Sequence, residues 1–75
     1  MDSKRYKKEI KQFGENVRRF RTEQGLTQFS LEALTGIDRG DISRIENGLV
    51  DIQFSRAVKL AEGLEISTNE LFDFG

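Results

Sequence analysis

The 75-residue sequence contains no cysteine, histidine, tryptophan or proline. Without cysteine no disulfide can form, and without cysteine and histidine the usual zinc sites are excluded. The absence of proline favours helices, because turns must then be made by glycine, asparagine, aspartate and serine. No run approaches the roughly 18 apolar residues that span a membrane. These absences predict one small, soluble, cytoplasmic domain without metal or cofactor, stabilised by a packed core, by oligomerisation or by both.

Charge is unevenly distributed along the chain, although the formal net charge is only −1. Eight basic and three acidic residues lie in residues 1–21, whereas four basic and ten acidic residues follow. A basic segment of this kind favours an anionic partner such as nucleic acid, and a merely solvated tail is the alternative. We interpret residues 1–8 as a flexible basic N-terminal arm and residues 9–75 as a single folded domain.

Apolar spacing and helix-end signals predict five helices and therefore an all-α fold. Apolar residues recur three and four positions apart in residues 10–20 and again in residues 54–61, where Phe54 begins the stripe. Residues of the types that cap helix N-termini precede three helices: Thr27, Asp38 and Ser67, the last in a capping box with Glu70. Glycines are expected to end four helices, at Gly25, Gly36, Gly48 and Gly63.

The central segment is predicted to form a helix-turn-helix motif over about residues 28–47. Gln28–Leu34 would be its first helix, Thr35–Ile37 its turn and Asp38–Asn47 its second helix. Isoleucines would anchor the second helix on the core, which leaves these residues facing outward: Arg39, Gly40, Ser43, Arg44 and Asn47. A recognition helix presents such residues to base edges, and arginine suits guanine. A small bundle with solvated arginines is the alternative.

Motifs across residues 13–72 resemble the Xre/Cro family of lambda-repressor-like helix-turn-helix proteins. The matching segments are FGENVR at 13–18, GLTQ at 25–28, GIDR at 36–39, ISRIENG at 42–48, AVKLA at 57–61, GLEIS at 63–67 and ELF at 70–72. The small size and the Asp38-Arg39 pair are similar to controller proteins of restriction–modification systems. The resemblance implies a compact five-helix bundle and a bacterial or phage-encoded regulator. We expect such a regulator to bind double-stranded DNA as a homodimer at a palindromic operator. A small-molecule effector is not expected, because the sequence shows no appended ligand domain.

The resemblance also implies roles for individual residues. Gln28 corresponds to a phosphate-contacting glutamine, and Ser43 to an outward position that reaches bases or backbone. The base-reading positions correspond to Arg39, Gly40 and Arg44. Asn47 and Gly48 correspond to a loop whose amides approach phosphates. Finally, the resemblance implies a buried salt bridge between Arg21 and Glu46, which ties the first helix to the recognition helix.

Three residues in the first helix of the motif depart from the family's pattern. Glu32 stands where the family prefers alanine, and Phe29 and Leu34 are apolar where the family is usually polar. Two explanations remain open. Either this helix is rotated so that Ala33 is the small contact residue, or Phe29 and Leu34 form an exposed apolar spot that marks a partner site.

The C-terminal segment is predicted to contain the dimer interface. The expected interface residues are Leu64, Leu71, Phe72 and Phe74. The capping box orients one face of the last helix toward the core, and the remaining aromatic surface at the end of the domain then suits a second copy of the chain. The alternative is that the rings fold back and cover the core of their own chain.

The sequence offers little support for function classes other than DNA binding. Catalysis is not expected, because histidine and cysteine are absent and only Ser55 with Lys59 suggests a nucleophile and its base. An antitoxin-like or adaptor module with the same fold is the main alternative, since fold alone does not establish function. The outward glutamine, arginines and asparagine favour the sequence-specific DNA-binding regulator.

Overall fold

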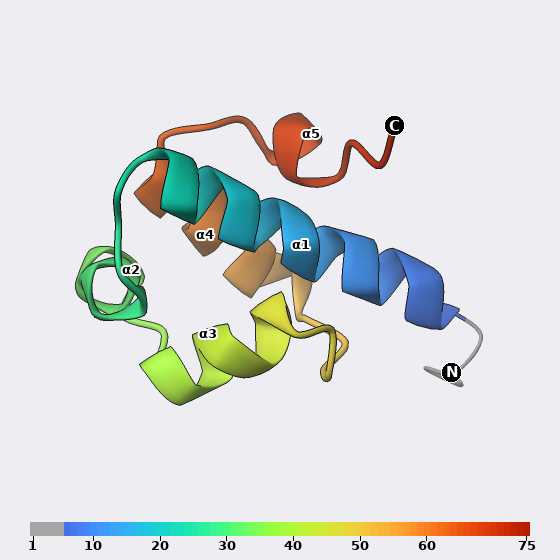
Figure 1. Cartoon of the computed structure of the whole chain (residues 1–75), viewed down its shortest axis with the longest axis horizontal. Coiled ribbons are helices and arrows are strands. Elements are labelled where there is room, and N and C mark those ends of the chain that lie inside the picture. The colour runs from blue at the N-terminus through green and yellow to red at the C-terminus, as the bar shows by residue number, and fades with distance from the viewer. Residues whose placement is uncertain (1–5) are drawn as a thin grey trace.

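The structure is a computed structural model that describes residues 6–75. Five helices follow one another in this part of the chain (Figure 1): α1 at Lys7–Glu23, α2 at Gln28–Thr35, α3 at Arg39–Glu46, α4 at Phe54–Leu64 and α5 at Thr68–Leu71. The predicted all-α, five-helix bundle is confirmed. Within residues 6–75 no helix combines the length and the apolar character that a membrane span requires.

The first helix begins slightly earlier than the sequence suggested. Lys7 and Lys8, which we assigned to the N-terminal arm, already form the first turn of α1. The rest of the expected arm, residues 1–5, lies outside the described residues. Figure 1 shows α1 running along the whole length of the molecule, so that it contacts the three helices α3, α4 and α5. α1 therefore supports α3, α4 and α5, while α2 packs against α3 and α4.

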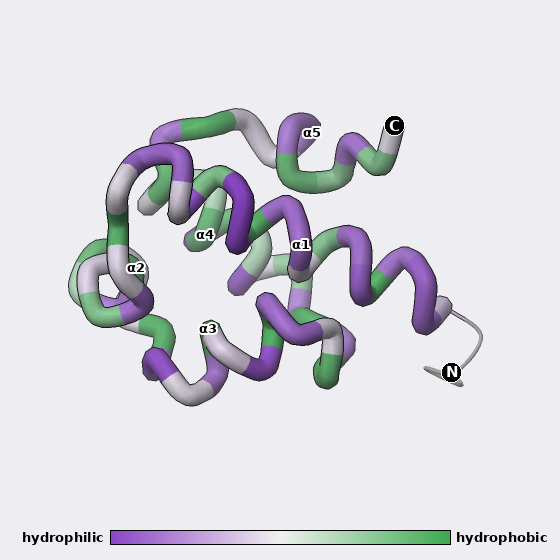
Figure 2. The backbone as a smooth tube through the Cα atoms, in the orientation of Figure 1, coloured by the Kyte–Doolittle hydropathy of each residue, from purple (hydrophilic) through white to green (hydrophobic). Residues whose placement is uncertain are grey.

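A single apolar core lies between the helices (Figure 2). The buried apolar residues come from all five helices and from the α2–α3 turn: Phe13, Val17, Leu31, Ile37, Ile42, Ile45, Ala57, Leu60, Ala61, Leu64 and Leu71. The isoleucines of α3 are among them, as predicted, so this helix is anchored on one face and free on the other. Burial of each isoleucine, leucine, valine or phenylalanine side chain in this core contributes about 1.5–3 kcal/mol.

Gly14 lets α1 and α3 approach closely. A Cβ atom at this position would collide with the carbonyl oxygen of Ile45 and would lie 3.0 Å from that of Glu46. Both obstacles are backbone atoms of α3, which a rotamer change cannot move. A side chain at Gly14 would therefore push α3 away from the long helix that supports it.

Two predictions about α4 were wrong. The helix does not end at Gly63 but continues to Leu64, and Glu65 takes the left-handed conformation with φ 57°. Gly63 instead allows close packing on α2, because a Cβ there would lie 2.6 Å from Cγ2 of Thr35. Phe54 is not a core residue either: it is 71% exposed, since it occupies the first position of α4, at the edge of the core.

The C-terminal segment folds back onto the N-terminal half of the chain. The predicted capping box is present in α5, where Ser67 Oγ accepts from the Glu70 amide and the Glu70 carboxylate accepts from the Ser67 amide. The side-chain amide of Asn16 on α1 donates to the carbonyl oxygens of Leu71 and Asp73, each at 2.9 Å. These bonds fix the last turn of the chain against α1.

The predicted dimer interface is partly wrong. Leu64 and Leu71 are fully buried in the core of their own chain, so no second copy can reach them. Phe74 is half-buried against the same core, and the Phe72 ring lies 4.9 Å from the Phe13 ring. The rings therefore fold back in part, as the alternative interpretation held, while Phe72 remains 42% exposed.

The close crossing at Gly14 generates a stability prediction. Gly14→Ala should lower the free energy of unfolding by about 1–3 kcal/mol, because the added methyl group meets backbone that cannot yield. Chemical denaturation measures this change. Glu15→Ala, at an exposed position one residue along α1, is the control and should stay within about 0.5 kcal/mol of wild type. A Gly14→Ala protein as stable as wild type would contradict the close crossing.

Candidate nucleic-acid interface

The helix-turn-helix motif consists of α2, a short turn and α3. Thr27 caps α2 by accepting a hydrogen bond from the Ser30 amide at 3.0 Å. Gly36 ends α2 in the left-handed conformation, with φ 75°, and Asp38 caps α3 by accepting from the Gly40 amide at 2.9 Å. The turn and both caps were predicted from the residue types. The turn and the two caps place the N-terminus of α3 next to α2.

A buried hydrogen-bonded ion pair fixes α3 relative to α1 and α2. Arg21 Nε donates to Glu46 Oε2 at 2.6 Å, and Arg21 Nη2 donates to Glu46 Oε1 at 3.0 Å. Gln28 Nε2, at the start of α2, donates to the same Oε1 at 3.1 Å. One carboxylate from the end of α3 thus joins three helices. The structure contains the salt bridge that the family resemblance implied, with Gln28 as an additional partner.

The ion pair is well shielded from water. The Arg21 side chain is 12% exposed and the Glu46 side chain 3% exposed. The hydrogen bond to Glu46 raises the pKa of Arg21, and burial opposes this change less strongly. Arg21 Nη1 also donates to the Leu26 carbonyl oxygen at 2.8 Å, in the α1–α2 turn. Desolvation of the two charges offsets much of their attraction, so the pair adds little net stability. Its main effect is to fix the position of α3 relative to α1.

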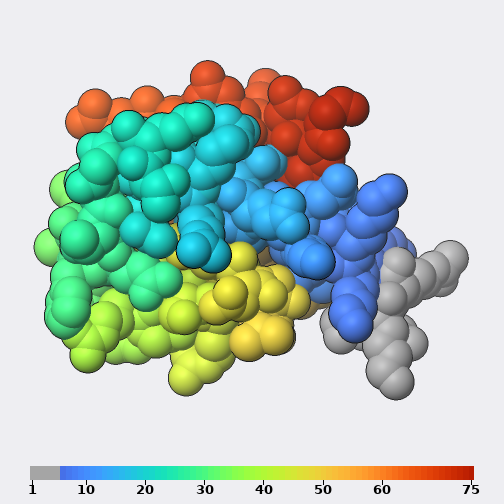
Figure 3. All heavy atoms as spheres, in the orientation of Figure 1, coloured from blue at the N-terminus to red at the C-terminus, as the bar shows by residue number. Residues whose placement is uncertain are grey.

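The expected contact residues lie on the outer side of this motif. Arg39 and Arg44 on α3 and Asn47 directly after it are exposed. The others are half-buried: Gln28, Gly40, Ser43 and Gly48. In Figure 3 the atoms of α2 and α3 adjoin on one surface of the molecule. The structure thus brings the side chains from α3 together with the start of α2.

Two side chains of α2 contact Arg39, one at its guanidinium and one at its backbone amide. Its guanidinium carbon lies 3.9 Å from the centre of the Phe29 ring, in a cation–π contact. Its backbone amide donates to Glu32 Oε2 at 3.0 Å. Because Arg39 is the first residue of α3, this amide has no partner within its own helix. Glu32 therefore acts as a second acceptor at the N-terminus of α3, beside the Asp38 cap.

Arg44 is held over Gly40 by an acidic neighbour. Arg44 Nη1 donates to Asp41 Oδ1 at 2.6 Å, while Arg56 of α4 donates to Asp41 Oδ2 at 3.4 Å. A Cβ at Gly40 would lie 3.7 Å from Arg44 Nη1 and 2.9 Å from the Asp38 carboxylate. Gly40 thus leaves room for the guanidinium and for the helix cap. Both arginines on α3 are ordered by side chains of their own chain.

The turn after α3 has fewer free donors than the family resemblance implied. The Asn47 amide donates to the Ser43 carbonyl oxygen and the Gly48 amide to that of Ile45, each at 3.0 Å. Gly48 also packs on α1, because a Cβ there would lie 2.9 Å from Cα of Lys11. The Asn47 side-chain amide donates to the Ser43 carbonyl oxygen at 2.9 Å and, more weakly, to Ser43 Oγ at 3.5 Å.

The two explanations for the unusual residues of α2 can now be separated. Ala33 is exposed, so it is not the small contact residue of a rotated helix. Phe29 is 60% exposed and Leu34 57% exposed, which agrees with the exposed apolar spot. Sequence reasoning missed the support that Phe29 and Glu32 give to Arg39, because this contact joins different helices. The spacing of Asp41 and Arg44, three residues apart on one helix, is a signal that could have revealed their ion pair.

These features define a helix-turn-helix protein: a capped two-helix motif whose second helix is anchored on one face and carries ordered arginines on the other. The chain belongs to the helix-turn-helix family HTH_3, which matches residues 17–71. The resemblance to the Xre-like regulators, which are DNA-binding transcription regulators, is therefore confirmed.

Solved structures that are similar to this chain include two regulators. The restriction–modification controller protein C.AhdI from Aeromonas hydrophila is 36% identical with a TM-score of 0.82, over 84% of this chain and 96% of that one. An HTH_3 family transcriptional regulator from Vibrio cholerae is 26% identical with a TM-score of 0.84. That match covers 88% of this chain but 37% of the Vibrio chain. No curated protein matches the sequence.

The buried pair generates a prediction about stability. Replacing Arg21 with leucine, or Glu46 with leucine, should each destabilise the fold by about 3–5 kcal/mol, because one buried charge loses its partner. The double variant should be far less destabilised than the sum of the two, since neither charge remains. Urea denaturation of the four proteins measures the coupling. Additive effects would show that the two side chains do not stabilise each other.

Proposed function

We propose that this protein is a sequence-specific transcription regulator that binds a palindromic DNA operator as a homodimer. The proposal rests on the exposed face of α3, where neighbouring side chains hold Arg39 and Arg44 in place. We call this surface, with Arg39 and Arg44, the reading face. A recognition helix inserts such residues into the major groove, and arginine contacts guanine with two parallel hydrogen bonds.

The start of α2 supports a phosphate contact beside the base-reading helix. Its first amide groups have no intrahelical partner, so that the helix N-terminus attracts anions. Gln28, the first residue of α2, donates one side-chain hydrogen to Glu46 and has a second one to offer. Because Glu46 belongs to α3, its hydrogen bond to Gln28 would fix the distance between the phosphate contact at α2 and the base contacts of α3. Phosphate contacts position the protein, whereas base contacts specify the sequence.

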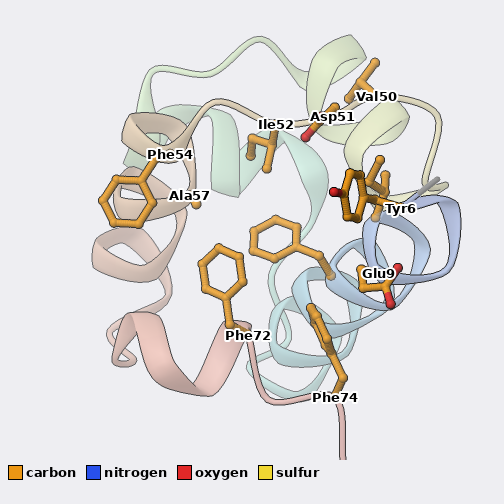
Figure 4. A pocket seen from close by; sticks show the side chains of 11 residues that line it. Tyr6, Glu9, Val50, Asp51, Ile52, Phe54, Ala57, Phe72 and Phe74 are labelled. Carbon is orange, nitrogen blue, oxygen red and sulfur yellow. The ribbon is translucent and has the colours of Figure 1, made fainter. Parts of the chain in front are cut away.

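An apolar groove supports the dimeric part of the proposal (Figure 4). The groove has a volume of about 540 Å³ and lies between the start of α1, the α3–α4 loop, the start of α4 and the C-terminal segment. Exposed apolar side chains line it: Tyr6, Val50, Phe54 and Phe72. A second copy would cover this surface symmetrically, with each copy offering the same groove. Two recognition helices about 34 Å apart would then read a palindrome.

The reading face generates a prediction about DNA affinity. Arg39→Ala and Arg44→Ala should each weaken binding to the preferred duplex by about 1–3 kcal/mol and relax base preference, because each removes a bidentate contact. Fluorescence anisotropy titrations measure both effects. Lys59→Ala, which removes an exposed charge on α4 outside the motif, is the control and should keep the base preference. Wild-type binding by both arginine variants would show that α3 does not read DNA.

The groove generates a prediction about oligomeric state. Phe54→Ser should weaken dimerisation about tenfold or more, since exposed aromatic anchors dominate such interfaces. Leu49→Ser is a matched control, because Leu49 is also 71% exposed but does not line the groove. Sedimentation equilibrium gives the dissociation constants. Phe54 is preferred to Phe72 for this test, because Phe72 also contacts the core residue Phe13. A Phe54→Ser protein that dimerises as wild type does would rule this surface out.

A further inference from the structure

Two side chains of α2 hold Arg39 without belonging to its helix. The Phe29 ring lies under the guanidinium at 3.9 Å, and the Glu32 carboxylate accepts the backbone N–H of the same residue at 3.0 Å. Phe29 and Glu32 are three residues apart, so they lie on one side of α2. We call these two residues the Arg39 clamp.

We propose that the Arg39 clamp is a positioning device that determines base specificity, with Phe29 orienting the guanidinium before DNA binds. This inference rests on the proposed function, because it assigns Arg39 a base to read. Phe29 acts through Arg39 and is a positioning residue. Glu32 holds the backbone amide of the same residue, so that both the backbone and the guanidinium of Arg39 contact α2.

The contact suits this role because the guanidinium lies over the Phe29 ring, which offers no oxygen or nitrogen acceptor to its N–H groups. The five N–H donors of arginine therefore do not have to give up a hydrogen bond to this ring before they reach a base. Arg44 is held differently, since one of its donors is directed to Asp41. A stacked arginine loses less rotamer freedom on binding than a free one does.

Phe29 contributes little else to the fold. Its side chain is 60% exposed, and the core is formed by other residues. Leu34, on the same helix, is similarly exposed at 57%, but its Cβ lies toward α4, within 3.5 Å of a Cβ built on Gly63. The two exposed apolar residues of α2 therefore have different surroundings. Of the two, Phe29 contacts Arg39, whereas Leu34 faces α4.

The first test is made on the free protein by NMR. The ring current of Phe29 should shift the side-chain protons of Arg39 upfield. Phe29→Leu, which keeps an apolar side chain without a ring, should abolish this shift, and Phe29→Tyr should retain it. Since Phe29 is exposed, both variants are expected to remain folded, and thermal denaturation checks this. Unshifted Arg39 protons in the folded wild type would overturn the proposal.

The second test measures specificity. Wild type and variants are titrated with the duplex that wild type selects from a randomised pool, and with duplexes carrying each single base-pair substitution. Phe29→Leu should lower discrimination about two- to fivefold at the base pair read by Arg39 and nowhere else. Phe29→Tyr should restore it, and Leu34→Ala, the matched control, should leave it unchanged. In an Arg39→Ala background, Phe29→Leu should have no further effect.

The outcomes separate the two proposals. If Arg39→Ala relaxes base preference but Phe29→Leu does not, the clamp is rejected and the proposed function stands. If Arg39→Ala itself leaves base preference unchanged, Arg39 does not read DNA, and the clamp is rejected with it. If Phe29→Leu changes base preference at another base pair, and its effect adds to that of Arg39→Ala, then Phe29 contacts DNA directly. In that case Phe29 does not position Arg39, and the clamp is rejected.

Discussion

The arrangement of α1, α2 and α3 depends on the buried Glu46 carboxylate. It accepts two hydrogen bonds from Arg21 of α1 and one from Gln28 of α2, although it is carried by α3 and is buried. A buried carboxylate is costly unless every acceptor position is satisfied, so only a narrow range of helix positions meets this requirement. The apolar core holds the helices together, and this polar network determines how α3 is presented.

The contacts of the acidic residues around α3 explain how the proposed DNA-binding surface is compatible with an overall acidic chain. Glu32 and Asp38 accept the free amides at the N-terminus of α3, and Asp41 pairs with Arg44 and Arg56. Each carboxylate is therefore engaged by donors of its own chain. Net charge describes the whole molecule, whereas DNA binding depends on the local field and on the donors that a helix presents.

Local signals in the sequence predicted much of the fold, and contacts between helices account for what was missed. The capping box at Ser67 depends on residues four positions apart or fewer, so its residue types suffice to predict it. Gly63 was misread as a helix end because its role lies in packing against α2, and Glu65 takes the left-handed position instead. The contact between Phe29 and Arg39 joins two helices, and no spacing rule within one helix reveals it.

In-vitro selection of the wild-type protein on random DNA duplexes tests the central claim most directly, because it reports sequence preference, symmetry and spacing together. The account predicts a single enriched motif made of two inverted half-sites, with centres about one helical turn apart and with guanines in each half-site. Enrichment of no sequence, at a salt concentration where the protein still binds DNA, would contradict sequence-specific reading by α3. An enriched motif without inverted symmetry would contradict the two-fold dimer.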